Sequence, residues 1–217
     1  LDRPGRTTGN PVVLQSNRSQ CFNGSFVLGM GFVLEAGEAS QLIADDERSA
    51  DVIFPFLNGE DLNDHPRHLA ARKVINFFDW SESEAARFPA CWKIVEQRVR
   101  PERQRRTHDG SYALRGTLPS KYWQYAEKRP ALYETTRNMR KVLVIAATSK
   151  LVMPVFVPTG QVFSHATYVF AYDDDFHFGV LSSAFHWWWA VTHASTLETR
   201  IRYTPTDCFE TFAQPDY

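Results

Sequence analysis

The sequence predicts one mixed α/β domain in which short, twisted β-sheets pack with helices. Residues 142–171 contain several short β-branched runs separated by proline and glycine, which is typical of strands. Residues 36–48 and 176–193 repeat apolar side chains every three or four positions, which is typical of helices. The 217 residues, 43% of them hydrophobic, suffice for one ordinary to large domain with its own core.

Further elements are predicted along the first hundred residues. The strand that begins at residue 51 is expected to stop at Pro55, and Asn58-Gly59 is a turn dipeptide. Ser81 with Glu84 three positions later forms a capping box, which predicts a helix start. The expected strands cover residues 12–14, 21–34 (a pair broken by glycines), 51–54 and 73–80, and the expected helices cover residues 36–48 and 89–99.

The second half is predicted to be mainly β before one apolar helix. The expected strands cover residues 142–147, 152–157, 161–163 and 167–171. The aspartates at 173–175 are expected to cap a helix over residues 176–193, whose Phe178, Leu181, Phe185, Trp188 and Trp189 would share an apolar face.

The spacing of apolar and polar residues changes after this predicted helix. Residues 197–203 alternate in polarity, so a strand would place Glu198, Arg200 and Arg202 on one face. One acceptor and two bidentate donors in a row suit the reading of base edges in DNA.

Four motifs in the chain, in order, resemble a known family. They are Val-Leu-Gly-Met-Gly-Phe-Val-Leu at 27–34, Phe-Pro-Phe-Leu-Asn-Gly-Glu-Asp-Leu-Asn at 54–63, Val-Ile-Asn-Phe-Phe-Asp-Trp at 74–80 and Phe-Gly-Val-Leu-Ser-Ser-Ala-Phe-His at 178–186, and residues 122–133 also fit. Together they resemble the target recognition domain of MmeI-like restriction–modification enzymes, which are single-chain adenine DNA methyltransferases, many of them fused to an endonuclease.

The resemblance implies a domain that recognises duplex DNA in sequence-specific fashion. It implies base contacts by Glu198, Arg200 and Arg202, and the turn from Ser164 to Thr167 adds His165 and Ala166 as a second candidate for base contact. The expected domain covers residues 11–205, between a linker at 1–10 and a tail at 206–217 that leads to a further segment.

The resemblance places catalysis in a separate methyltransferase domain of the parent enzyme. That domain would methylate adenine N6 with S-adenosylmethionine and would be the second partner of this chain besides DNA. Its glycine-rich loop and Asn-Pro-Pro-Tyr tetrad do not occur here, since Asn10-Pro11 is followed by valine. We therefore expect no catalytic residue, metal or cofactor in this chain.

Basic residues accumulate between residues 93 and 115, although the whole chain has a formal net charge of −1. This near-neutral balance argues against a uniformly cationic DNA binder, but a local excess can still neutralise phosphates. The alternative is a solvated helix end, where the dipole favours arginine. The expected phosphate contacts are Arg100, Arg103, Arg105, Arg106 and, on a loop between strands, Lys150.

Two other classes of function remain open. A metal-dependent hydrolase could use the acidic residues and histidines at 60–68 or the aspartates at 173–175, although a solvated loop and a helix cap explain them as well. A protein-interaction module could use Trp187, Trp188 and Trp189, which cannot all face one core. His177, His186 and His193 are expected in the core or an interface.

The cellular compartment is expected to be the cytoplasm. The three cysteines are far apart and without a Cys-x-x-Cys pair, which fits a reducing environment. No signal peptide or membrane-spanning apolar stretch is recognisable, so no membrane partner is expected.

Overall fold

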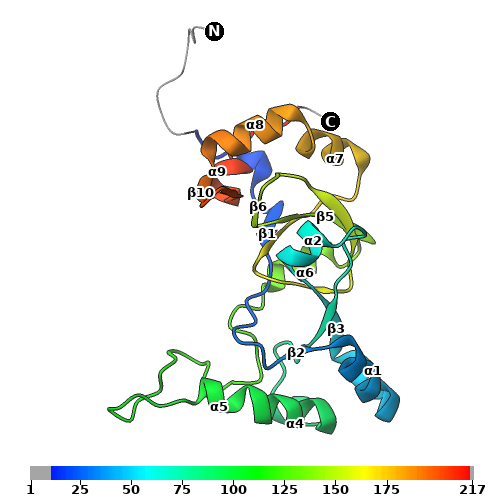
Figure 1. The fold of residues 1–217 in the computed structure, drawn as a ribbon, viewed down its shortest axis with the longest axis vertical. Helices are drawn as coiled ribbons and strands as arrows, with labels where there is room; N and C mark the ends of the chain where they lie inside the picture. Colours follow the sequence, from blue (N-terminus) through cyan, green and yellow to red (C-terminus); the bar gives the residue numbers. More distant parts are fainter. Residues whose placement is uncertain (1–10, 216–217) are drawn as a thin grey trace, which may run out of the picture.

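The computed structural model describes residues 11–215, which form three small β-sheets packed with helices (Figure 1). The predicted mixed α/β fold is confirmed. The molecule is elongated, with α7, α8 and α9 at one end and α1, α4 and α5 at the other (Figure 1).

The central sheet has the order β1-β9-β5-β7 and is antiparallel throughout. Its strands are β1 (Cys21–Asn23), β9 (Thr167–Phe170), β5 (Lys141–Ala146) and β7 (Val155–Pro158). Both faces are covered, so β5 is buried from Val142 to Ala146. Alternate β5 residues enter two different cores, because successive side chains point to opposite faces of a strand.

The two cores are completed by helices from distant parts of the chain. One contains Leu62 of α2 (Gly59–Asp64) and Leu132 of α6 (Pro130–Thr136). The other is covered by α7 (Asp175–Leu181), α8 (Ala184–His193) and α9 (Pro205–Cys208).

A second sheet, of order β2-β4-β3-β8, carries the third core. It consists of β2 (Val33–Leu34), β4 (Arg72–Ile75), β3 (Ile53–Leu57) and β8 (Val162–Phe163) and packs near α1 (Ala36–Asp45) and α4 (Pro89–Arg98). The sequence predicts that this strand stops at Pro55, but Pro55 lies within β3. It is tolerated because β8 pairs only with Phe56 and Leu57, which leaves Pro55 at the margin of that ladder.

The third sheet, of order β10-β11-β6, is small and largely exposed. It contains β10 (Ser195–Leu197), β11 (Arg200–Arg202) and β6 (Thr148–Ser149). The remaining elements are η1 (Gln15–Asn17), η2 (Glu47–Asp51), α3 (Glu82–Ala85) and α5 (Arg100–Arg103). The capping box at Ser81 is confirmed, since its hydroxyl accepts from the Glu84 amide.

Several predicted elements are wrong in extent. No strand forms at residues 12–14, and β1 and β2 belong to different sheets instead of pairing. The apolar helix is broken into α7 and α8, because the Ser183 hydroxyl caps α8 by accepting from the His186 amide. Strand β4 ends at Ile75, and the residues after it form a turn in which Phe78 has φ 51°.

The packed region extends beyond the predicted boundary at residue 205. Cys208, Phe209 and Phe212 are buried, and the amide of Asn17 donates to the carbonyls of Phe209 and Phe212. The first part of the expected tail is thus built into the fold, whereas the expected linker at 1–10 lies outside the described residues.

Candidate nucleic-acid interface

The segment predicted as one strand over residues 197–203 is a β-hairpin. Leu197 pairs with Arg200, which leaves Glu198 and Thr199 as a two-residue turn. Glu198 has φ 55°, a left-handed conformation suited to such tight turns. The expected row of three side chains on one strand face is therefore wrong, and Glu198 sits at the tip of the hairpin.

Arg200 and Arg202 do share one face of β11, as expected for residues two apart. Both are exposed, and within residues 11–215 neither guanidinium forms an ion pair. Strand β11 is the middle strand of its sheet and also pairs with β6, where Arg202 lies opposite Thr148 and Ile201 opposite Ser149. Two uncompensated guanidinium groups are thus presented to solvent by a small sheet.

Lys150 lies in the loop directly after β6 and shares a cavity with Arg200. The cavity measures about 610 Å³ and is also lined by Glu60, Asn63 and Asp64 of α2. The fold thus brings together two predicted DNA contacts that are fifty residues apart in sequence. The sequence predicts no interface role for these three α2 residues, although Glu60 and Asn63 belong to the 54–63 motif.

The turn at His165 and Ala166 lies beside the same small sheet. The Thr167 amide donates to the Ser164 carbonyl and closes the turn, and the Ala147 amide donates to the Ala166 carbonyl at 2.8 Å just before β6. The His165 ring packs on Phe26 with ring centroids 4.6 Å apart, and partial burial lowers its pKa. A neutral imidazole and a methyl group therefore stand next to the hairpin.

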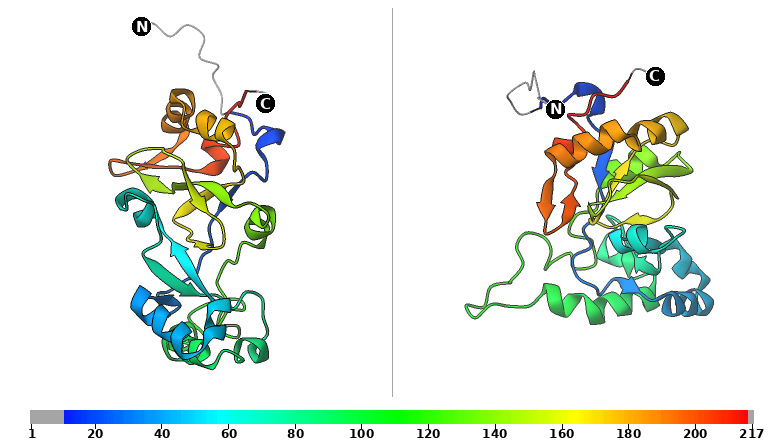
Figure 2. Two further views of the ribbon diagram at one scale, coloured as in Figure 1. Left: turned by 90° about the vertical axis from the view of Figure 1, so that its right-hand side faces the viewer. Right: turned by 45° about the horizontal axis from the view of Figure 1, so that its top comes forward.

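Residues 104–121 form an arm that leaves α5 and projects from the same side of the molecule as the hairpin (Figures 1 and 2). Arg106 and Tyr112 form an isolated antiparallel β-bridge through their backbones. The Arg106 guanidinium donates to the Gly110 carbonyl at 2.6 Å and lies over the Tyr112 ring. At the tip, the Asp109 carboxylate accepts from Thr107 and Ser111, and these hydrogen bonds lower its pKa to about 2. The arm is therefore ordered by its own polar contacts.

The other predicted phosphate contacts near the arm are divided between surface and core. Arg105 and Arg106 are exposed on the arm. Arg100 is exposed at the start of α5, where it hydrogen-bonds Gln104 and Glu96 and lies over the Tyr122 ring. These three guanidinium groups remain accessible to a phosphate.

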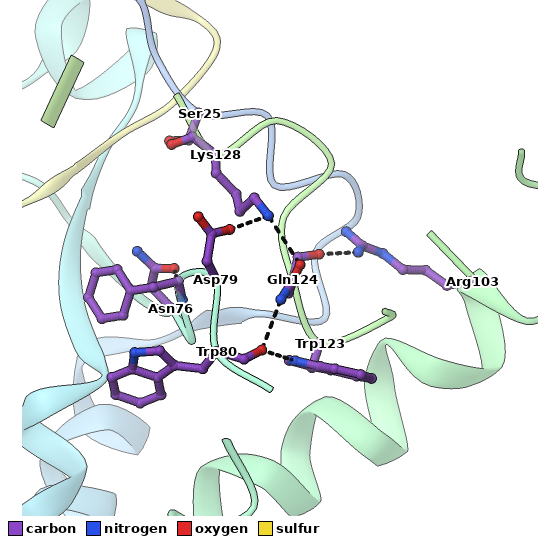
Figure 3. A network of polar contacts seen from close by, with 9 residues as sticks. Ser25, Asn76, Asp79, Trp80, Arg103, Trp123, Gln124 and Lys128 are labelled. Carbon is purple, nitrogen blue, oxygen red and sulfur yellow. Dashed lines mark hydrogen bonds and ion pairs between the residues drawn. The ribbon is translucent and has the colours of Figure 1, made fainter. Parts of the chain in front are cut away.

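Arg103, in contrast, cannot contact phosphate, and that prediction is wrong. Its side chain is only 1% exposed. Its guanidinium donates to the carbonyls of Val27 at 2.5 Å, Leu28 at 3.2 Å and Tyr122 at 3.3 Å, and to the carbonyl of Gln124 (Figure 3). Burial lowers its pKa to about 10, so it stays charged at neutral pH. Arg103 thus holds the 27–28 and 122–124 segments together at the base of the arm.

The network around Gln124 continues this internal brace. The Gln124 amide and the Trp123 indole both donate to the Trp80 carbonyl at 2.9 Å, and Lys128 pairs with Asp79 (Figure 3). The 122–133 and 74–80 motifs are thus joined by polar contacts. Their aromatic side chains serve packing, because Tyr122, Trp123 and Tyr125 are buried.

The acidic and histidine-rich segments have local structural roles. The His65 ring accepts from the Arg67 and Leu69 amides, and the Asp174 carboxylate caps α7 by accepting from the His177 amide. Across residues 11–215, no three His, Cys, Asp or Glu side chains are grouped in a way that could hold a metal ion. No observation here favours the metal-dependent alternative.

His186 is fully buried between α8 and the base of the hairpin. Its Nδ1 lies 2.7 Å from the Leu181 carbonyl and its Nε2 lies 3.0 Å from the Tyr203 hydroxyl. A carbonyl only accepts, so Nδ1 carries the proton and Nε2 accepts from the phenol. Burial lowers the pKa of His186 to about 4. The expected placement of His186 in the core is confirmed.

The apolar face predicted for residues 176–193 is only partly buried. Leu181, His186 and Ala190 face the core, whereas Phe185 is 81% exposed and Trp188 is 56% exposed. Trp187, Val191 and Phe178 are also exposed. We call Phe185, Trp187, Trp188 and Val191 the α8 aromatic face.

Comparisons with known proteins cover nearly the whole chain. The family model described as MmeI, target recognition domain, matches residues 14–216. A solved structure of the Type IIL restriction-modification enzyme MmeI in complex with DNA matches 97% of this chain with a TM-score of 0.73 and 20% sequence identity. This chain spans only 27% of that MmeI chain. No curated protein matched, and no helix within residues 11–215 has the length and apolar character needed to cross a bilayer.

Proposed function

The chain belongs to the MmeI target recognition domain family, and from this membership we propose that it recognises DNA. This membership confirms the resemblance drawn from the motifs. The chain would provide sequence-specific recognition of double-stranded DNA within an adenine-N6 methyltransferase or restriction–modification enzyme. The observation that carries the proposal is the exposed hairpin, in which Arg200 shares a cavity with Lys150 and neither Arg200 nor Arg202 has an ion pair among residues 11–215. The 165–166 turn is hydrogen-bonded to Ala147, next to β6 of the same sheet.

The base contacts are assigned to two neighbouring segments. Arg200 and Arg202 would donate to guanine O6 and N7, and Glu198 at the hairpin tip would accept from a cytosine amino group. In the adjacent turn, His165 offers a neutral ring and Ala166 a methyl group suited to the thymine methyl. A projecting hairpin of this kind fits the width of the major groove.

The phosphate contacts are assigned to Arg100, Arg105, Arg106 and Lys150. The arm and the hairpin project from the same side of the molecule, so a duplex between them would meet both (Figure 2). Contacts to phosphate fix the register of the protein and weaken as salt increases, because they release counterions.

The chemistry of the parent enzyme is assigned to another domain. The sequence contains neither the Asn-Pro-Pro-Tyr tetrad nor the glycine-rich loop of the methyltransferase, so S-adenosylmethionine would bind there and not to this chain. This chain would hold the duplex while that domain flips and methylates an adenine. The parent enzyme would act in the cytoplasm.

The function is tested by selecting bound duplexes from a random pool with the protein that contains this domain. We expect a defined motif, and we expect Glu198→Lys and Arg200→Asp to alter a base pair of it, since a bidentate contact contributes about 1–3 kcal/mol of discrimination. Arg87→Asp, at an exposed arginine away from the hairpin, is the matched control. An unchanged motif in both variants would show that the hairpin does not contact bases. Selection of no motif at low salt would refute sequence-specific DNA recognition.

We also propose that the α8 aromatic face packs against the methyltransferase part of the parent enzyme. Exposed Phe185 and Trp188 form an apolar surface of the kind that marks protein–protein contacts. Trp188→Glu should therefore lower methylation by the parent enzyme several-fold while the affinity of this domain for DNA is retained. Unchanged methylation would contradict the contact, and Arg137→Glu, at the exposed residue directly after α6, serves as the control.

A further inference from the structure

Helix α2 (Gly59–Asp64) begins within the 54–63 motif, to which the proposed contacts assign no role. It lies between the two proposed reading segments, the 165–166 turn and the sheet of the hairpin. Each end of the helix contacts one of them, and the contacts are polar and specific.

The amino-terminal end of α2 contacts the 165–166 turn. Asn58 caps the helix, and its side-chain oxygen accepts from the Gly59 amide at 2.8 Å and from the Ser164 hydroxyl at 3.0 Å. The same hydroxyl accepts from the Ala166 amide at 3.1 Å. Gly59 is so close to the turn that a Cβ there would lie 3.1 Å from the Ala166 carbonyl oxygen.

The other end of α2 contacts the hairpin sheet through Asn63. Its side-chain oxygen accepts from the Ser149 hydroxyl at 2.8 Å, and its amide nitrogen lies 3.4 Å from the Thr148 carbonyl. The Ser149 hydroxyl also accepts from the Leu151 amide at 3.3 Å, so this hydrogen bond closes the loop that contains Lys150. Strand β6 in turn pairs with β11, the strand that carries Arg200 and Arg202.

Helix α2 is itself firmly anchored. The buried Asp61 carboxylate accepts from the Asn58 amide at 2.8 Å and the Ala71 amide at 3.1 Å, and Leu62 enters a core. Six helical residues span roughly 9 Å, which is about two to three base-pair steps of a duplex. An anchored element of fixed length therefore separates the two segments.

We propose that α2 sets the spacing of the two reading segments and that Asn63 is a positioning residue for base recognition. The inference rests on the proposed function. Asn63 is exposed at the surface, so its side chain contributes little to the packing of the core. Its bonds hold β6 and the Lys150 loop where Arg200 and Lys150 share one cavity.

The test is Asn63→Ala in the full protein that contains this domain, with binding to the selected duplex and to random duplex measured side by side. Two lost hydrogen bonds should lower the ratio of these affinities about tenfold. Affinity for random duplex and the melting temperature should stay near the wild-type values. Ser149→Ala should reproduce the effect, Ser149→Thr should restore the wild-type ratio, and Asn138→Ala, at another exposed asparagine, is the control.

The outcomes separate this inference from the function it rests on. A wild-type protein that selects no motif overturns both. A wild-type motif with an unchanged ratio in Asn63→Ala and Ser149→Ala overturns the role of α2 alone. Equal losses for selected and random duplex, together with a lower melting temperature, would show that Asn63 only stabilises the fold and would also overturn it.

Discussion

Replacing Arg103 with methionine is expected to lower the free energy of unfolding by about 3–5 kcal/mol, the range for breaking a buried charged contact. The guanidinium donates to four backbone carbonyls from two distant segments, and methionine would leave those acceptors without their donor. The free energy of unfolding of Arg103→Lys should lie between those of the wild type and Arg103→Met, because an ammonium lacks the planar fork that reaches several carbonyls.

Denaturant unfolding measures this effect, with Arg105→Met as a matched control at an exposed arginine two residues away. The control should change stability by less than about 0.5 kcal/mol, as is usual for surface substitutions. Equal unfolding midpoints for the two variants would mean that Arg103 does not brace the fold. The salt dependence of DNA affinity should fall for Arg105→Met, because this variant removes the phosphate contact proposed for Arg105.

Acidification is expected to destabilise the domain through His186 by up to about 3 kcal/mol, since each unit of pKa difference corresponds to about 1.4 kcal/mol. The pKa of His186 is lowered to about 4 in the folded chain, against 6.5 for a free side chain. Below pH 6.5 the unfolded state takes up a proton that the folded state excludes. The stabilisation is therefore complete above pH 6.5 and is lost as the pH falls through 4.

The measurement compares unfolding free energies at pH 7.5 and pH 4.5 for the wild type and His186→Gln. Glutamine does not titrate, so the variant should lose less stability over this range, whatever its stability at pH 7.5. Other carboxylates and histidines contribute equally to both proteins and cancel in the difference. An identical loss in the two proteins would show that His186 has the same pKa in the folded and unfolded states, and would contradict the prediction.

The predictable parts of the fold are those in which local sequence decides the structure. The β-branched run at 142–147 lies between turn residues and forms β5 almost as predicted. The capping box at Ser81 and the Asp174 cap of α7 were also recognisable, because a cap involves residues only three apart. Nearby residues carry the whole signal in these cases.

The errors occur where distant residues decide. Arg100 and Arg103 look alike in sequence, but the carbonyls that bury Arg103 come from residues 27–28 and 122–124. The turn at Glu198 and Thr199 contains no glycine, asparagine or proline, so the sequence predicts a single strand where the structure has a hairpin. The periodicity of residues 176–193 predicts one buried face, but Phe185 and Trp188 stay exposed because α9 and the hairpin base already fill the core that α7 and α8 cover.

The proposed base-contacting positions are separate from the residues that pack the core, and this bears on how the proposed specificity of the domain can diverge. The side chains at 198, 200 and 202 are exposed, whereas Tyr203 directly after them is buried and bonded to His186. Exchanges at the three outer positions should leave stability nearly unchanged, because they touch no core residue. A lineage could thus move from one target sequence to another through single substitutions, each giving a folded protein, while the residues beneath the hairpin stay under constraint.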